Sequence, residues 1–261
     1  MRLKNVGIFA LISFSLAVPL AAFAQGDSAE HTKRGIELAK QKQYEKAAEE
    51  FGAAMKADPN DPKHYLNRGR AYRMAGKLPE AEKDFTHLIE VNKEDPDGYS
   101  ERGKVRVSQK NWDAAIEDLS KAIELNDDDI DSYRYRAFAY LSKNQYDKAI
   151  EDYSQVLESK KDDTQALERR AFAYVGAKQF EEAIADYTKV IDKNPKDPEA
   201  LRGRGYAYSQ ANQYDKAAAD YQALLKLKPN DANAQQGLKS AQQKMGGSKA
   251  PGAAPAPTVQ P

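Results

Sequence analysis

A repeat of 34 residues runs without interruption through most of this chain and occurs six times between residues 28 and 231. Two columns show it most clearly, one of small residues and one of alanine. The small-residue column comprises Gly35, Gly69, Gly103, Ala137, Ala171 and Gly205. The alanine column comprises Ala47, Ala81, Ala115, Ala149, Ala183 and Ala217. A unit of this length is too short to bury a core of its own, so the units must stack on one another.

Apolar residues within each repeat follow the period of a helix. In the fourth repeat, Tyr133 and Leu141 fall on one face of a first helix. Ala149 and Tyr153 fall on one face of a second. Asn144 stands between the two stripes, and asparagine tolerates the left-handed conformation that ends many helices. Each unit is therefore predicted to be a helix-turn-helix.

The combined columns resemble the tetratricopeptide repeat (TPR) family over about four-fifths of the chain. The sixth repeat carries the family pattern in Leu201, Gly205, Tyr208, Ala217, Tyr221 and Pro229. Departures are local, such as Arg106 in place of an aromatic residue. The resemblance implies an all-α, right-handed superhelical solenoid of six helix-turn-helix TPR units with a C-terminal capping helix. The units are expected at residues 28–61, 62–95, 96–129, 130–163, 164–197 and 198–231.

The two ends of the chain fall outside the repeats. Residues 1–24 combine a basic start, an apolar run and Ala22-Phe23-Ala24, which predicts a secretory signal peptide cleaved before Gln25; an uncleaved membrane anchor is the alternative. Residues 232–245 form one narrow apolar stripe and are expected to be the capping helix. Residues 246–261 are rich in proline and alanine and are expected to be a disordered tail, either a solvated terminus or a tether.

Arginine and acidic residues form two further columns, sixteen residues apart. In an antiparallel helix hairpin these two positions lie at the same height, so each arginine faces an acid across its own helix pair. The expected structural ion pairs are Arg34–Glu50, Arg68–Asp84, Arg102–Asp118, Arg136–Asp152, Arg170–Asp186 and Arg204–Asp220. A row of arginines that binds anions is the alternative, but the matched acids favour structural pairs.

The TPR resemblance also implies a concave face that binds peptides or proteins. The positions that line this face in the family are basic in the earlier repeats and include an aromatic row in the later ones. They comprise Lys63, Arg70, Arg73, Lys104, Arg134, Phe138, Phe172, Arg202 and Tyr206. The alternative for Phe138, Phe172 and Tyr206 is packing between neighbouring helices. One aromatic residue per repeat favours a binding row, because aromatic residues often dominate binding energy.

Composition argues against several classes of function. Lys plus Arg and Asp plus Glu both number 40, so no excess charge favours nucleic acid. Cysteine is absent, and the three histidines show no metal-ligand spacing. No motif of phosphate binding or nucleophilic catalysis occurs. We therefore expect no enzyme activity, no cofactor, no metal site, and no membrane contact after signal cleavage.

The sequence thus predicts a non-enzymatic scaffold in the bacterial periplasm that holds a peptide or protein segment in its concave groove. The alternative is an assembly or self-associating subunit of a cell-envelope complex that uses its edges, ends or tail. The identity of the partner, the pathway and the oligomeric state remain open at this point.

Overall fold

A computed structural model of the protein describes residues 20–247, with side chains from residue 26 to residue 246. These residues form thirteen α-helices, and no strand occurs among them. Contacts divide the chain into two compact units, Met1–Val91 and Asn92–Pro261. Most of the predicted signal peptide, residues 1–19, lies outside the described residues, and so does the tail after residue 247.

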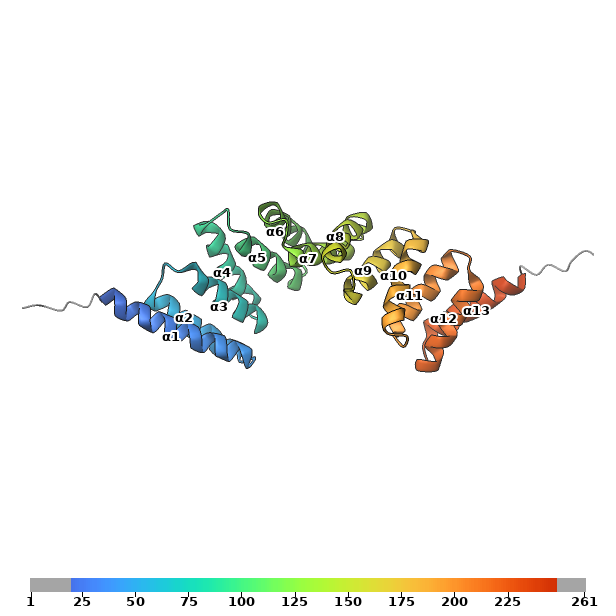
Figure 1. Ribbon diagram of the computed structural model, residues 1–261, viewed down its shortest axis with the longest axis horizontal. Helices are drawn as coiled ribbons and strands as arrows, with labels where there is room; N and C mark the ends of the chain where they lie inside the picture. The colour runs from blue at the N-terminus through green and yellow to red at the C-terminus, as the bar shows by residue number, and fades with distance from the viewer. Residues whose placement is uncertain (1–19, 248–261) are drawn as a thin grey trace, which may run out of the picture. The chain divides into compact units, whose positions relative to one another are not determined.

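The described part of the first unit consists of two helix pairs (Figure 1). The helices are α1 (Leu20–Lys40), α2 (Tyr44–Ala57), α3 (Pro62–Met74) and α4 (Leu78–Val91). Residues 20–24, which the signal prediction includes, belong to α1. Ala47, Ala48 and Phe51 on α2 pack with Ala71 on α3, so consecutive pairs share a core.

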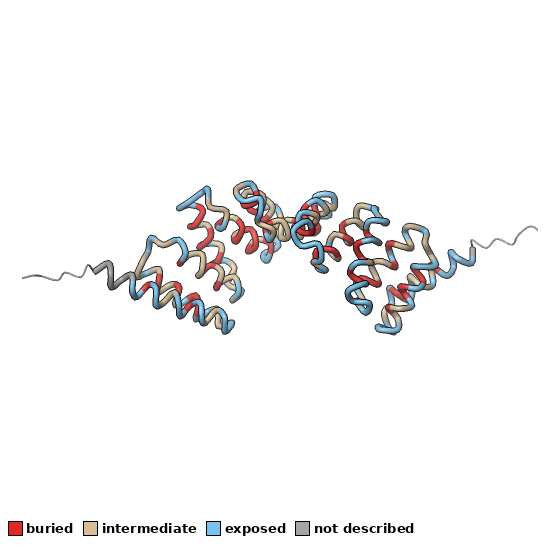
Figure 2. The backbone as a smooth tube through the Cα atoms, viewed as in Figure 1, coloured by how far each residue is buried: buried red, intermediate tan, exposed pale blue. Residues whose placement is uncertain are grey.

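The second unit continues the same alternation of first and second helices. Its helices are α5 (Pro96–Ser108), α6 (Trp112–Leu125), α7 (Ile130–Ser142), α8 (Tyr146–Ser159), α9 (Thr164–Gly176), α10 (Phe180–Lys193), α11 (Pro198–Gln210), α12 (Tyr214–Leu227) and α13 (Ala232–Gly247). Buried and exposed positions alternate along these helices (Figure 2). One apolar cluster runs from Ala137 to Ala241, so the last repeats and α13 share a continuous core. The predicted all-α repeat solenoid is thereby confirmed.

Local chemistry sets the helix ends. The residue that ends each turn has a positive φ, between 57° and 77°, and occupies the same position in every repeat. It is Gly76 or an asparagine at 144 and 212, but a lysine at 42, 110 and 178. An aspartate side chain accepts a backbone N–H bond at the start of each first helix after α1, which satisfies a donor that the helix leaves open. These aspartates are Asp61, Asp95, Asp129, Asp163, Asp197 and, before α13, Asp231.

Candidate functional site

Five of the six predicted arginine–acid pairs form, each within its own helix pair. In the fourth repeat, Arg136 donates from Nε and Nη2 to the two carboxylate oxygens of Asp152, at 2.9 and 2.8 Å. The other four pairs have the same two-bond geometry, with distances between 2.7 and 3.0 Å. The aspartates are buried, and hydrogen bonding to Asp84 raises the pKa of Arg68. These arginines are therefore structural, as the matched acids indicated.

The pair expected in the first repeat, Arg34–Glu50, does not form, and this prediction was wrong. Arg34 instead pairs with Glu30 on its own helix at 3.4 Å, while Glu50 accepts a bond from His31 at 2.7 Å. Two differences explain the change. His31 occupies a carboxylate oxygen of Glu50. The side chain of Arg34 is 53% exposed, so water solvates its charge.

A column of hydroxyl residues, which we did not anticipate, ties successive pairs together. Arg136 and Arg170 each donate from Nη1 to a serine of the preceding repeat, Ser120 and Ser154, both at 3.0 Å. Arg204 does the same to Thr188 at 3.2 Å. The signal was present in the sequence, because these hydroxyl residues recur with the 34-residue period.

Three of the expected groove residues lie in the first unit, on α3. Lys63 is exposed and lines a pocket of about 720 Å³ between α1 and α3. Arg70 and Arg73 are half-buried and make polar contacts of their own.

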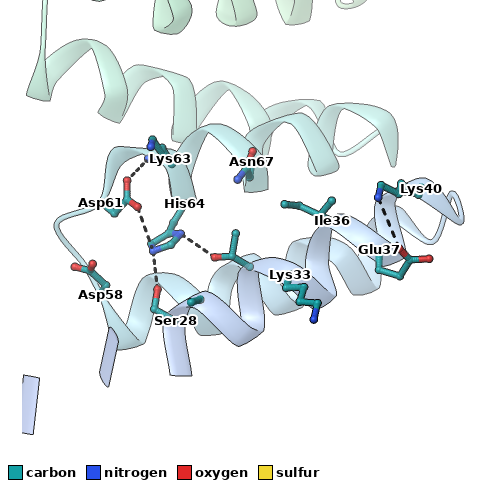
Figure 3. Close-up of a pocket in the computed structure, with 12 residues that line it drawn as sticks. Ser28, Lys33, Ile36, Glu37, Lys40, Asp58, Asp61, Lys63, His64 and Asn67 are labelled. Carbon is teal, nitrogen blue, oxygen red and sulfur yellow. Dashed lines mark hydrogen bonds and ion pairs between the residues drawn. The ribbon is translucent and has the colours of Figure 1, made fainter. Parts of the chain in front are cut away.

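That pocket contains a serine, a histidine and an aspartate in proximity (Figure 3). The Oγ of Ser28 lies 2.8 Å from Nε2 of His64, and a carboxylate oxygen of Asp61 lies 3.9 Å from the same nitrogen. A catalytic triad needs the acid on the opposite ring nitrogen, so that the acid orients the base. Here Nδ1 faces Thr32 at 3.5 Å, and both Ser28 and His64 are buried. The cluster therefore joins α1 to α3 and lacks the geometry of a nucleophile.

The expected cations of the second unit are neutralised within the fold. Lys104 is only 9% exposed, with its Nζ 3.4 Å from Glu101. Arg134 donates to Asp163 at 2.7 Å. Arg202 donates to Asp231 at 2.5 Å. These three side chains therefore already have acidic partners within the fold, and their contact with a partner protein stays a prediction.

The acids that neutralise Arg134 and Arg202 are the aspartates that cap the following helices. Burial by itself would raise the pKa of Asp163, but hydrogen bonds from Arg134 and from the backbone N–H of Ala166 outweigh burial, and the pKa falls below its ordinary value. The aspartate before each first helix recurs with the repeat, so this double role was open to prediction from the sequence.

The three residues of the expected aromatic row behave differently. Phe138 is half-buried and makes an edge contact with Trp112, with ring centroids 5.9 Å apart. It lines a small pocket of about 230 Å³. Phe172 and Tyr206 are 53% and 46% exposed, and both line a larger groove. Phe138 therefore packs against a neighbouring helix, whereas Phe172 and Tyr206 lie at the surface, and their role in binding stays a prediction.

We call this larger cavity the aromatic groove. It has a volume of about 750 Å³ and follows three first helices, α9, α11 and α13, with tyrosines of the second helices beneath them. The residues used below are Glu168, Arg169, Phe172, Gly203, Tyr206 and Gly237. All of them belong to the second unit.

Two glycines allow close contact with tyrosine rings that line the aromatic groove. A Cβ on Gly203 would lie 2.3 Å from Cζ of Tyr187, and a Cβ on Gly237 would lie 2.5 Å from Cζ of Tyr221. Both tyrosines are otherwise buried, and burial raises the pKa of each hydroxyl. Glycine thus lets a buried ring reach the floor of the groove, a role that the family pattern does not assign to position 203.

The described residues also bear on other kinds of site. Between residues 26 and 246, no three histidine or acidic side chains gather in a way that could hold a metal ion. None of the described helices has the length and apolar character needed to cross a membrane.

Comparison with known proteins identifies the family. A tetratricopeptide repeat model matches residues 32–98 and 168–232, and further TPR models match residues 103–143 and 136–163. The first model alone matches half of the chain, so the chain belongs to the tetratricopeptide repeat family. Proteins of this family are in general non-enzymatic scaffolds, and this chain is a protein-interaction repeat protein.

Individual relatives are more distant. U-box domain-containing protein 70 of Oryza sativa subsp. japonica is 42% identical over 50 residues, which cover 19% of this chain and only 6% of that protein. The crystal structure of YrrB, described as a TPR protein with an unusual peptide-binding site, has a TM-score of 0.69 at 19% identity and covers 74% of this chain and 99% of that one. The pilF protein of Pseudomonas aeruginosa has a TM-score of 0.68 at 13% identity and covers 84% and 99%. At these identities the two structures support the fold alone.

Proposed function

We propose that this protein is an exported scaffold that binds a segment of a partner protein in the aromatic groove. The observation that carries the proposal is the exposure of Phe172 and Tyr206, at 53% and 46%, in one concave surface. Exposed aromatic side chains that gather in one groove are typical of interaction sites, and aromatic residues often supply most of the energy of an interface.

The shape of the groove favours a peptide segment. Packed helices lie about 8–10 Å apart, so a segment that crosses α9, α11 and α13 meets a new side-chain row about every three residues when extended. Phe172 and Tyr206 occupy equivalent positions in successive repeats and so provide two such rows. The rings of Tyr187 and Tyr221, beneath Gly203 and Gly237, complete the apolar floor.

Selection of displayed random dodecapeptides on the purified protein tests the proposal. The selected peptides should bind the wild-type chain and lose most of their affinity for the double variant Phe172→Ser/Tyr206→Ser. The thermal midpoint of that variant should be nearly unchanged, because both side chains are about half exposed. A matched control is Leu227→Ser/Met245→Ser, which removes two exposed apolar side chains that do not line the groove.

The outcomes separate the groove from other surfaces. If the double groove variant binds as well as wild type, or if no peptide is selected, groove binding fails and the assembly-subunit interpretation takes its place. A chain that ends at Met245 provides a second comparison. Loss of residues after 245 should leave groove binding intact, whereas a tether would lose its function.

Export is a separate part of the proposal and rests on the basic start, apolar run and Ala22-Phe23-Ala24 motif. N-terminal sequencing and intact mass of the protein, isolated from the periplasmic fraction of a bacterial host, should give Gln25 as the first residue. Recovery of residues 1–24 in the membrane fraction would instead indicate an anchored protein.

A further inference from the structure

One position in the aromatic groove breaks a pattern that its neighbours keep. In the repeats before and after it, an arginine on the first helix bonds the capping aspartate 29 residues later: Arg134 with Asp163, and Arg202 with Asp231. At the equivalent position of the fifth repeat stands Glu168, and the corresponding capping residue is Asp197. Two carboxylates thus occupy the place of an arginine–aspartate pair.

Glu168 has no cationic partner among the described residues. It is half-buried and lines the groove beside Phe172. None of the described residues forms an ion pair or a side-chain hydrogen bond with Glu168. Burial raises the pKa of Glu168, and the nearby charges of Asp197 and Glu199 raise it further. The charged carboxylate is therefore destabilised by its surroundings.

Neither nearby arginine forms an ion pair with Glu168. Arg202 already bonds Asp231 and Glu199. Arg169 opposes the pKa shift of Glu168 only in part, and its guanidinium lies over the ring of Phe138, 5.7 Å from the centroid, toward α7. The third acid, Glu199, has Arg202 and Lys228 as partners. Glu168 is thus the acid of the groove that has no ion-pair partner among the described residues.

We propose that the aromatic groove selects a partner segment that carries a lysine or arginine, which pairs with Glu168 and lies against Phe172 and Tyr206. This rests on the proposed peptide binding and names its specificity. A cation suits the site twice, because it neutralises a partly desolvated carboxylate and because aromatic rings attract cations.

The test uses the dodecapeptides selected on the wild-type chain, acetylated and amidated so that their ends carry no charge. These peptides should be enriched in lysine or arginine flanked by apolar residues. Replacing that basic residue by glutamine should weaken binding about tenfold, as loss of a hydrogen bond between charged groups does. The protein variant Glu168→Gln should weaken binding of the basic peptide by the same factor, and the two changes together should cost no more than either alone.

Two further variants control for folding and for general charge. Glu181→Gln removes the same charge from an exposed position on α10 outside the groove and should leave affinity unchanged. Glu168→Arg restores the pattern of the neighbouring repeats, so it should raise the thermal midpoint while it abolishes binding of the basic peptide. Loss of affinity in a variant that is more stable excludes unfolding as its cause.

Each outcome decides between the two levels of the proposal. If the selected peptides depend on Phe172 and Tyr206 but are acidic or neutral, or if Glu168→Gln binds them unchanged, the basic-residue specificity is wrong while groove binding stands. Acidic peptides that depend on Arg169 would assign the specificity to that residue. If no selected peptide depends on Phe172 and Tyr206, both the specificity and the proposed function are wrong.

Discussion

At the scale of single residues, two charged positions of the repeat differ in how far the fold neutralises them. Arg136 uses three N–H groups at once, two for Asp152 and one for Ser120 of the preceding repeat. Tyrosines at 133 and 140 flank its guanidinium at 5.5 and 5.9 Å from their centroids. The charge of Arg136 is thus fully paired within the fold, whereas Glu168 has no ion-pair partner among the described residues.

We expect Asp152→Ala to destabilise the protein by about 3 kcal/mol, because it leaves a largely buried guanidinium without its acid. Arg34→Ala should cost less than about 0.5 kcal/mol, because that side chain makes only an exposed pair with Glu30. Thermal and urea unfolding of both variants measures the difference. Equal effects of the two substitutions would contradict the structural role of the buried pairs.

A second prediction concerns the pH dependence of Glu168→Gln. The folded-state pKa of Glu168 is raised above its ordinary value of 4.5, so the folded protein is penalised when the carboxyl group is charged and gains stability as pH falls through that raised pKa. At pH 7 the glutamine variant should therefore be more stable than wild type. Below pH 4.5 the advantage should vanish, because the carboxyl group is then protonated in both folded and unfolded chains. An advantage that persists at pH 3 would mean that charge is not its source.

At the scale of helices, glycines two residues apart on α11 have different roles. A Cβ on Gly203 would lie 2.3 Å from the ring of Tyr187, whereas a Cβ on Gly205 would lie 3.1 Å from the ring of Tyr221. The column of Gly205 already holds alanine at 137 and 171. A Cβ is therefore tolerated at position 205, whereas a Cβ at position 203 would collide with the ring of Tyr187.

Gly203→Ala should destabilise the protein by about 1–3 kcal/mol, because a buried tyrosine must move. Gly205→Ala should be neutral or stabilising by up to about 1 kcal/mol, because alanine favours helix and the equivalent repeats accommodate it. Chemical denaturation of the two single variants compares them directly. A stable Gly203→Ala protein with unchanged peptide affinity would show that the groove does not require glycine at the contact with Tyr187.

The same contrast shows what the sequence could and could not predict. The 34-residue period and the alternating apolar stripes predicted an all-α repeat solenoid, because helix packing imposes regular columns. The arginine and acidic columns predicted six ion pairs for the same reason, and five of them form. The Arg34–Glu50 prediction failed because the first pair has a competing His31, which a column cannot show. The pairing of Arg134 and Arg202 was not predicted, because a list of lining positions does not show which arginines already bond capping aspartates.

At the scale of the whole molecule, the aromatic groove belongs to the second unit alone. Residues that line it come from α8 to α13, and none comes from the first unit. Repeat arrays derive their stability from neighbouring repeats, so a stack of this length can fold without more distant ones. The chain from residue 92 to residue 247 should therefore unfold cooperatively and bind the selected peptides as tightly as the full chain. A folded fragment with much weaker binding would indicate that the first unit contributes to recognition.

The central claim is that a peptide segment occupies the aromatic groove. Its most direct test is backbone amide chemical-shift mapping of the ¹⁵N-labelled full chain, titrated with a selected dodecapeptide. The account predicts that the largest shifts fall on α9, α11 and α13, at residues such as Glu168, Phe172, Gly203, Tyr206 and Gly237. Shifts confined to α10 and α12, to the first unit, or to residues after 247, with the amides of Phe172 and Tyr206 unchanged, would contradict it.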